Sequence, residues 1–388
     1  MNRPLLYLCT ASAIAACSID VDVDSNDDDD PSSGDEAGMP EARAYEVTNL
    51  VADQGDDADH VDANLVNPWG LAFGPETYFW VANNGTSTAT IYDADGRART
   101  DLVGGPITLP QPMQPLGEDE AAEAPGPTGQ VYNGVGRFEI APGMPAEFLF
   151  ATTAGTLLGW SSDVDPRIAT IVVDNSAEGA VYTGLAIAGF DQGALLYAPN
   201  FTSGEIDVFD DGFADVELGD RAFVDPNVPE GYAPFNVQVI DGMAYVAYAK
   251  RASDGEESTG AGSGFVSQFD LGGQFVTRIA SNGMLNAPWG MTRAPKSFGR
   301  YGGALLVGNF GDGRITAYDF ASHRPLGQLV DTADKPIAIE GLWAIAFGNG
   351  RRAGESEDLY FTAGPGDELH GRFGEIEALT SDEGSNEL

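Results

Sequence analysis

The chain contains 388 residues, of which 43% are apolar and 10% aromatic, so it can bury a substantial core. Its formal net charge of −41 predicts a solvated acidic surface that repels nucleic acid and anionic lipid. The 50 glycines and 23 prolines exclude a mainly helical protein and favour short strands joined by tight turns.

Residues 1–16 have the features of a lipoprotein signal peptide. Arg3 precedes a short apolar run, too short for a typical membrane span, that ends in Ile14-Ala15-Ala16-Cys17. This ending matches a bacterial lipobox, so we expect cleavage before Cys17, lipidation of Cys17 and an extracytoplasmic, membrane-anchored protein. Ser18 favours the outer membrane in a cell that has one; an ordinary secretory signal is the alternative. After cleavage Cys17 is the last cysteine, which excludes an intramolecular disulfide.

Residues 17–43 are acidic, contain Ser and Pro, and have no aromatic residue. This composition predicts a disordered tether between the lipid and the folded body. Its run of aspartates lacks the glycine and the distant glutamate of a calcium-binding loop, which favours a solvated spacer. Residues 381–388 are predicted to be a disordered tail.

Six segments of the chain share one pattern, and they start at Trp69, Thr128, Thr183, Phe235, Trp289 and Leu342. Each has a short apolar run, a stronger apolar run, a hairpin rich in Gly or Asp, and an alternating strand. This alternation is typical of half-buried antiparallel strands, and regular recurrence indicates a repeat architecture.

A single small sheet cannot bury both of its faces, but six sheets arranged radially can. The sequence therefore predicts an all-β fold, a six-bladed β-propeller formed by residues 44–380 as one domain. The repeated "PWG" at Pro68 and Pro288 is predicted to enter the innermost strand of blades one and five. The last segment is one strand short, so we expect "AYEVTNLVAD" from Ala44 to supply its outer strand and remove a free edge.

Several phrases carry a resemblance to a known family: "TNLVAD", "NPWGLAFGP", "FLFATTAGTLLGW", "LNAPWGMTRAP", "LLVGNFGDGRITAYD" and "LYFTAGPGDELHGRFGEI". Over residues 45–379 the chain resembles a family of bacterial extracytoplasmic proteins of unknown activity, many with a C-terminal PEP-type sorting anchor. It is distantly similar to NHL-repeat and gluconolactonase-like propellers. The chain departs from many relatives because it ends in "SDEGSNEL" and has a lipobox instead, which implies surface location by another attachment.

The motifs of common hydrolases are missing from the sequence. It has three histidines, His60, His323 and His370, and no Gly-x-Ser-x-Gly elbow, phosphate-binding loop, HExxH or paired-cysteine motif. His370 follows Asp367 and Glu368, a combination that can bind a metal or move protons. The alternative is a loop histidine that bonds where the ring closes.

Asparagines recur at corresponding places in the repeat. The resemblance to gluconolactonase-like propellers implies a divalent metal, calcium or magnesium, at one mouth of the channel. The residues that we expect as its ligands are Glu340, Asn200, Asn236 and Asn309. The alternative is that these asparagines, together with Asn83, cap turns and tie the blades together.

Aromatic residues also recur, with Trp69, Trp289 and Trp343 at equivalent positions. Exposed at a channel mouth with Tyr232, Phe235 and Phe310, they would form a stacking platform for a sugar or another flat ligand. We include Asn83 and His370 in this predicted ligand-binding set. The alternative is that the tryptophans are buried between blades.

The sequence favours a monomeric, surface-tethered binding module whose partner is an extracellular polymer, a sugar, an envelope protein or a small ligand. The alternative is a metal-dependent hydrolase of lactones or esters, whose bound water would attack the carbonyl. A scaffold in envelope assembly is a third possibility. The loops at residues 109–129 and 250–264 are expected to stand over one face and shape specificity.

Overall fold

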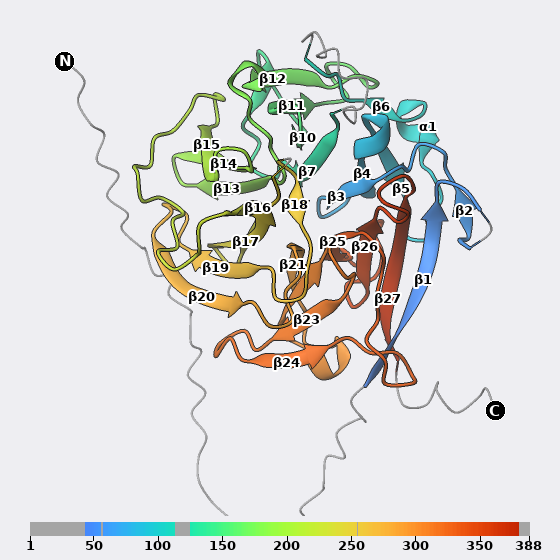
Figure 1. Ribbon diagram of the computed structural model, residues 1–388. Coiled ribbons are helices and arrows are strands. Elements are labelled where there is room, and N and C mark those ends of the chain that lie inside the picture. Colours follow the sequence, from blue (N-terminus) through green and yellow to red (C-terminus); the bar gives the residue numbers. More distant parts are fainter. Residues whose placement is uncertain (1–42, 56, 113–124, 254, 380–388) are drawn as a thin grey trace, which may run out of the picture. The chain divides into compact units, whose positions relative to one another are not determined.

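The computed structural model describes residues 43–55, 57–112, 125–253 and 255–379 of the chain. Six sheets surround a common axis, so the fold is the predicted all-β six-bladed propeller (Figure 1). The predicted signal peptide, Cys17, the acidic segment up to residue 42, most of the loop after residue 112 and the tail lie outside the described residues. Within the described residues, no helix is long and apolar enough to cross a membrane.

Blades one to three follow one another along the chain, each from its innermost to its outermost strand. Blade one contains β3 (Pro68–Ala72), β4 (Phe79–Asn83), β5 (Thr88–Tyr92) and β6 (Ile107–Thr108). Blade two contains β7 (Pro127–Tyr132), β10 (Phe148–Thr152), β11 (Thr156–Trp160) and β12 (Thr170–Asp174). In blade three, the described residues form three strands: β13 (Ala186–Phe190), β14 (Gly193–Asn200) and β15 (Glu205–Asp210).

The remaining blades have four or more strands. Blade four contains β16 (Tyr232–Ile240), β17 (Met243–Arg251), β19 (Phe265–Phe269) and β20 (Phe275–Ser281), with β18 (Glu257–Ser258) paired to β17. Blade five contains β21 (Pro288–Arg293), β22 (Leu305–Asn309), β23 (Ile315–Tyr318) and β24 (Pro325–Gln328). Blade six contains β25 (Leu342–Phe347), β26 (Leu359–Ala363), β27 (Arg372–Leu379), β1 (Ala44–Ala52) and β2 (His60–Val61).

Short elements lie in the connections between these strands. They are α1 (Thr100–Val103), the 3-10 turns η1 (Asn84–Thr86), η2 (Ser176–Glu178) and η3 (Gly299–Tyr301), and the hairpin of β8 (Glu139–Ala141) and β9 (Met144–Pro145).

The ring is closed by the N-terminal strand, as predicted. β1 pairs antiparallel with β27 from Ala44↔Leu379 to Ala52↔Arg372, so the first strand completes the last blade. β2 then pairs parallel with β1 at the outside of the same sheet. This arrangement covers the edge that β27 would otherwise expose.

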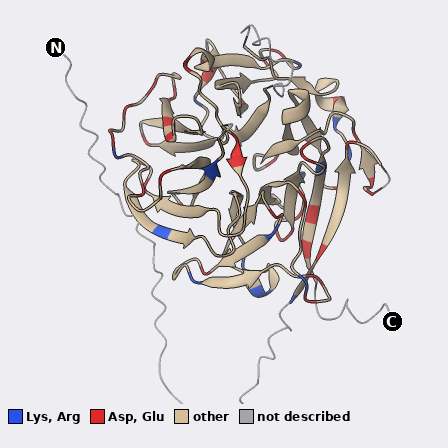
Figure 2. Ribbon diagram, in the orientation of Figure 1, with Lys and Arg blue, Asp and Glu red and all other residues tan. Residues whose placement is uncertain are grey.

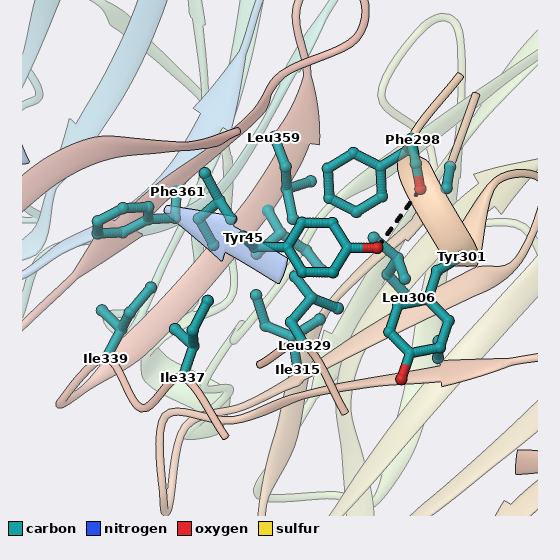
Figure 3. Packing of buried hydrophobic residues seen from close by; sticks show 14 of the residues in the cluster. Tyr45, Phe298, Tyr301, Leu306, Ile315, Leu329, Ile337, Ile339, Leu359 and Phe361 are labelled. Atoms are coloured by element: carbon teal, nitrogen blue, oxygen red, sulfur yellow. Dashed lines mark hydrogen bonds between the residues drawn. The ribbon is translucent and has the colours of Figure 1, made fainter. Parts of the chain in front are cut away.

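Tyr45 secures the closing strand against the neighbouring blade (Figure 3). Its side chain is 1% exposed and its ring lies 4.8 Å from Phe298 and 6.1 Å from Tyr301, both from blade five. Its backbone N–H donates to the C=O of Val330 at 2.9 Å. The contacts of β1 therefore join blades five and six as well as the two ends of the chain.

The repeated "PWG" has a structural explanation in the innermost strands. The pairing of β3 with β4 shifts register between Pro68 and Leu71, and that of β21 with β22 shifts between Pro288 and Met291. Such β-bulges re-aim side chains. Here the bulge contains the Trp-Gly pair, and both tryptophans belong to one buried cluster at the axis.

The glycine of the pair is required because neighbouring innermost strands approach closely. A Cβ added at Gly70 would lie 2.5 Å from the C=O oxygen of Thr128 in blade two. One added at Gly290 would lie 2.5 Å from the C=O oxygen of Trp343 in blade six. The motif therefore recurs where an aromatic side chain and a close backbone contact are needed together.

Candidate functional site

Aromatic side chains from five blades meet at the axis of the propeller. We call Trp69, Phe201, Phe235, Trp289, Phe310 and Trp343 the axial aromatic cluster. The rings of Trp69 and Trp343 stack with centroids 3.5 Å apart, and Phe310 stacks on Trp343 at 4.2 Å. Trp289 meets Trp343 edge-on at 5.7 Å. The cluster is thus packed like a protein core.

Two of the three indoles of the cluster are held by hydrogen bonds. Trp289 Nε1 donates to the C=O of Thr183 in blade three at 2.9 Å, and Trp343 Nε1 donates to Asn67 Oδ1 at 3.0 Å. Trp69 Nε1 is buried without a partner among the described residues. The bond from Trp289 reaches from blade five to blade three, so the cluster closes the channel at this level.

The predicted ligand-binding aromatics are therefore brought together in part. Trp69, Phe235, Trp289 and Trp343 are between 0% and 6% exposed, whereas Phe310 is half-buried. Tyr232 lies outside the cluster and packs on Phe265, with ring centroids 4.8 Å apart. Burial matches the alternative given for the tryptophans; ligand binding by these residues stays a prediction.

The recurring asparagines Asn83, Asn200 and Asn309 each end the second strand of a blade. Asn200 Nδ2 donates to Asp207 Oδ2 at 3.1 Å, and its Oδ1 accepts from the N–H of Val181 at 3.3 Å. Asn309 Nδ2 donates to the C=O of Met284 at 2.8 Å, and its Oδ1 accepts from an N–H in the same loop. The side chains of Asn200 and Asn309 thus link the end of the second strand to the loop before the first strand of the same blade.

Asn83 and Asn236 are both fully buried. Asn83 Nδ2 donates to the hydroxyls of Thr88 and Thr90, while its Oδ1 has no partner among the described residues. Asn236 Nδ2 donates to the C=O of Trp289 at 2.9 Å and so joins blades four and five.

The remaining predicted metal ligand, Glu340, is exposed, and its Oε1 accepts from the N–H of Gly366 at 3.0 Å. Within the described residues, no group of three or more His, Cys, Asp and Glu side chains is placed to hold a metal ion. The four predicted ligands belong to four different blades, and each makes a hydrogen bond within the protein. A calcium or magnesium site formed by them stays a prediction.

His370 lies where the ring closes. Its Nδ1 is 3.0 Å from Asp53 Oδ2, and the other oxygen of Asp53 accepts from the N–H of Gly371 at 3.0 Å. Asp53 directly follows β1, so these contacts tie the closing strand to the loop before β27. His60 is in β2, and His323 is in a turn with a φ of 60°.

A cavity of about 100 Å³ lies beside the cluster and is lined by the innermost strands of the blades. Its polar side chains are Gln130, Asn236, Gln238 and Thr292. Gln130 Nε2 donates to the C=O groups of Gly70 and Trp80, whereas its buried Oε1 has no described partner. Pockets for metabolites usually measure about 300–1,000 Å³, so this cavity is too small for a sugar.

A larger hollow, which the sequence did not predict, lies along the outer strand of blade three. It measures about 340 Å³ and is bounded by β15 and by residues 215–224. Its carboxylates are Glu205, Asp207, Asp215, Glu217 and Asp220. Burial and the neighbouring Asp207 carboxylate raise the pKa of Tyr182, whose hydroxyl donates to Asp207 Oδ2 at 2.9 Å. We call this hollow the blade-three groove.

The fold places the chain among six-bladed β-propellers, and comparison of sequences gives its family. The chain is 34% identical over 346 residues to the uncharacterized protein R648 of Acanthamoeba polyphaga mimivirus, covering 86% of this chain and 80% of that protein. It is 32% identical over 346 residues to the uncharacterized protein L690 of the same virus, covering 86% and 85%. The chain belongs to the family of these two proteins.

Among solved structures, a protein of unknown function from Bacteroides thetaiotaomicron matches with a TM-score of 0.51 and 12% identity. The match covers 86% of this chain and 76% of the other, and it supports the fold alone. No established family model matches the chain. The two relatives named above are viral, and membership of a bacterial extracytoplasmic family stays a prediction.

Proposed function

We propose that this protein is a binding module that holds its partner on the outer surface of the propeller. The observation that carries the proposal is the size of the axial cavity, about 100 Å³ beside a packed aromatic cluster. A site this small suits water or a small ion rather than a metabolite. The blade-three groove, at about 340 Å³, offers more room and opens on the outside of the ring.

The proposed location is extracytoplasmic, with the propeller tethered through a lipid on Cys17. The apolar run ending in Ile14-Ala15-Ala16-Cys17 and the acidic residues that follow it support this location. A polymer or protein of the cell envelope is then the partner that the module would meet. Mass spectrometry of the mature N-terminus tests this part of the proposal, because lipidation adds a diacylglycerol mass to Cys17.

The competing function, a metal-dependent lactone or ester hydrolase, needs a tightly bound ion at the axis. We expect the purified protein to contain no stoichiometric calcium or magnesium and to unfold at the same temperature in calcium and in a chelator. The reason is that the side-chain oxygens of Asn200, Asn236 and Asn309, the atoms that would bind the metal, already accept hydrogen bonds from backbone N–H groups. Elemental mass spectrometry and a thermal unfolding series make the measurement.

Near-stoichiometric metal would contradict this expectation, provided that Glu340→Ala removes it. Glu357→Ala is the matched control, since Glu357 is also exposed but lies in the loop before β26. Metal that is lost only from the Glu340 variant would favour the hydrolase and justify a screen of lactones and esters.

A further inference from the structure

We infer that the outer edge of blade three binds an extended, positively charged peptide segment of another molecule as a fourth strand. The inference rests on the proposed function and specifies the site and the chemistry of the partner. Blades one, two and five each have four strands in their sheets, and blades four and six have five, whereas the described sheet of blade three ends at β15.

The register of β15 shows which backbone groups face outward. Ile206 lies opposite Pro199 of β14, and the N–H of Thr183 donates to the C=O of Pro199 at 3.1 Å. The C=O of Pro199 therefore points to the inner side of the blade, away from β15. Pro199 and Ile206 are consequently a non-hydrogen-bonded pair of the antiparallel ladder. Ile206 consequently directs its own N–H and C=O away from β14, toward the outer edge.

One half of this edge is already covered by the chain that follows it. The N–H of Val216 donates to the C=O of Val208 at 2.8 Å, and the N–H of Asp210 donates to the C=O of Ala214 at 2.9 Å. Among the described residues, no strand pairs with the half around Ile206, which lines the blade-three groove instead. An extended peptide could continue the ladder there, which is the general mode of β-strand addition.

The groove selects a cation by its charge. Five carboxylates line it, on β15 and on the loop that follows. In Figure 2 the acidic residues of the ribbon are coloured red, including those of this part of the chain. Two arginines lie nearby: Arg221 adjoins Asp220 in sequence, and Arg251 donates to the C=O groups of Phe201 and Thr202. The net charge of these five carboxylates and two arginines is negative. Lysine or arginine side chains on one face of an added strand would therefore meet carboxylates.

The apolar part of the groove suits the other residues of such a peptide. Val216, Leu218, Ala222, Phe223 and Val224 line it, and Val224 is 50% exposed. Successive side chains of a strand alternate between its two faces. A segment that alternates basic and apolar residues therefore fits both kinds of lining.

The chain's own remaining segments are poor occupants of this groove. Residues 18–42, 113–124 and 380–388 contain acidic residues and no Lys or Arg. A second copy paired through the same edge would bring this acidic lining against itself. Like charges oppose both arrangements, so the charge favours a different molecule as the partner.

The test uses the full-length protein and a short peptide of alternating lysine and valine, with alternating glutamate and valine as the control peptide. We expect saturable one-to-one binding of the basic peptide by calorimetry. The exposed carboxylates allow a charge-reversal variant, Glu205→Lys with Glu217→Lys, that should weaken binding by about tenfold or more. The control variant, Asp163→Lys with Glu357→Lys, has the same net charge and should bind like the original protein.

Hydrogen exchange supplies a second measurement on the unaltered protein. The peptide should protect the N–H of Ile206 and leave the amides of the other blades unchanged. The single change Asp220→Lys serves if the double variant fails to fold. Equal weakening in the edge and control variants, or binding without protection at Ile206, would overturn the inference. Absence of binding would overturn the inference too. The metal measurement is independent of this experiment, because it tests the proposed binding module against the competing hydrolase.

Discussion

Replacing Gly129 by alanine is expected to lower the free energy of unfolding by about 3 kcal/mol or more. A Cβ at this position would lie 2.2 Å from the backbone N of Leu185 and 2.4 Å from the carbonyl carbon of Gly184. Both atoms belong to the next blade, so the overlap can be relieved only by separating two innermost strands. Urea unfolding, followed by circular dichroism, measures the effect.

Gly134→Ala is the matched control for this change. A Cβ there would lie 3.4 Å from the ring of Tyr132, which is an ordinary contact. We expect its stability to stay within about 0.5 kcal/mol of the original protein. If Gly129→Ala were equally harmless, the close contact between the innermost strands of blades two and three would be wrong.

Truncation of Trp343 to alanine should cost about 4 kcal/mol of stability. Its side chain is fully buried, stacks between Trp69 and Phe310, and donates a hydrogen bond to Asn67. Removing the ring leaves a cavity at the axis and an unpaired amide oxygen on Asn67. Trp343→Phe should cost less because it keeps much of the packing, although it also loses the hydrogen bond to Asn67.

Phe190→Ala provides the control, since Phe190 is 43% exposed and should cost little. A stable Trp343→Ala variant that had lost binding of a sugar would contradict this account. Such a result would place the tryptophan at an open mouth of the channel, as the predicted stacking platform requires.

Much of the fold could be predicted because its signals are local. The alternation of apolar residues and the Asp-Gly turns identify the strands of each repeat. The segment from Ala44 could be assigned to blade six because a propeller leaves no free edge at its closure, and β1 confirms this. The equivalence of Trp69 and Trp289 followed from the phrase that surrounds them.

The roles of the candidate site residues could not be predicted, because they depend on partners far away in the sequence. An asparagine can ligate a metal or cap a turn, and the partners of Asn200 and Asn309 come from the loop before the same blade. Phe201 was missed although it follows Asn200 as Phe310 follows Asn309, and this repeated Asn-Phe pair is the signal that could have identified it. The unpaired half of β15 was missed because it arises where the described sheet has no fourth strand, and the sequence has no motif that marks such an absence. Residues 211–231 have the sequence of an ordinary loop.

The central claim is that packed aromatic residues close the axis, so that binding takes place on the outside of the ring. Acrylamide quenching of tryptophan fluorescence tests it most directly. All five tryptophans, Trp69, Trp80, Trp160, Trp289 and Trp343, are at most 6% exposed. The account predicts weak quenching of the folded protein that becomes strong only on unfolding in urea. Strong quenching of the folded protein would show that tryptophans described as buried face solvent, and it would contradict the account.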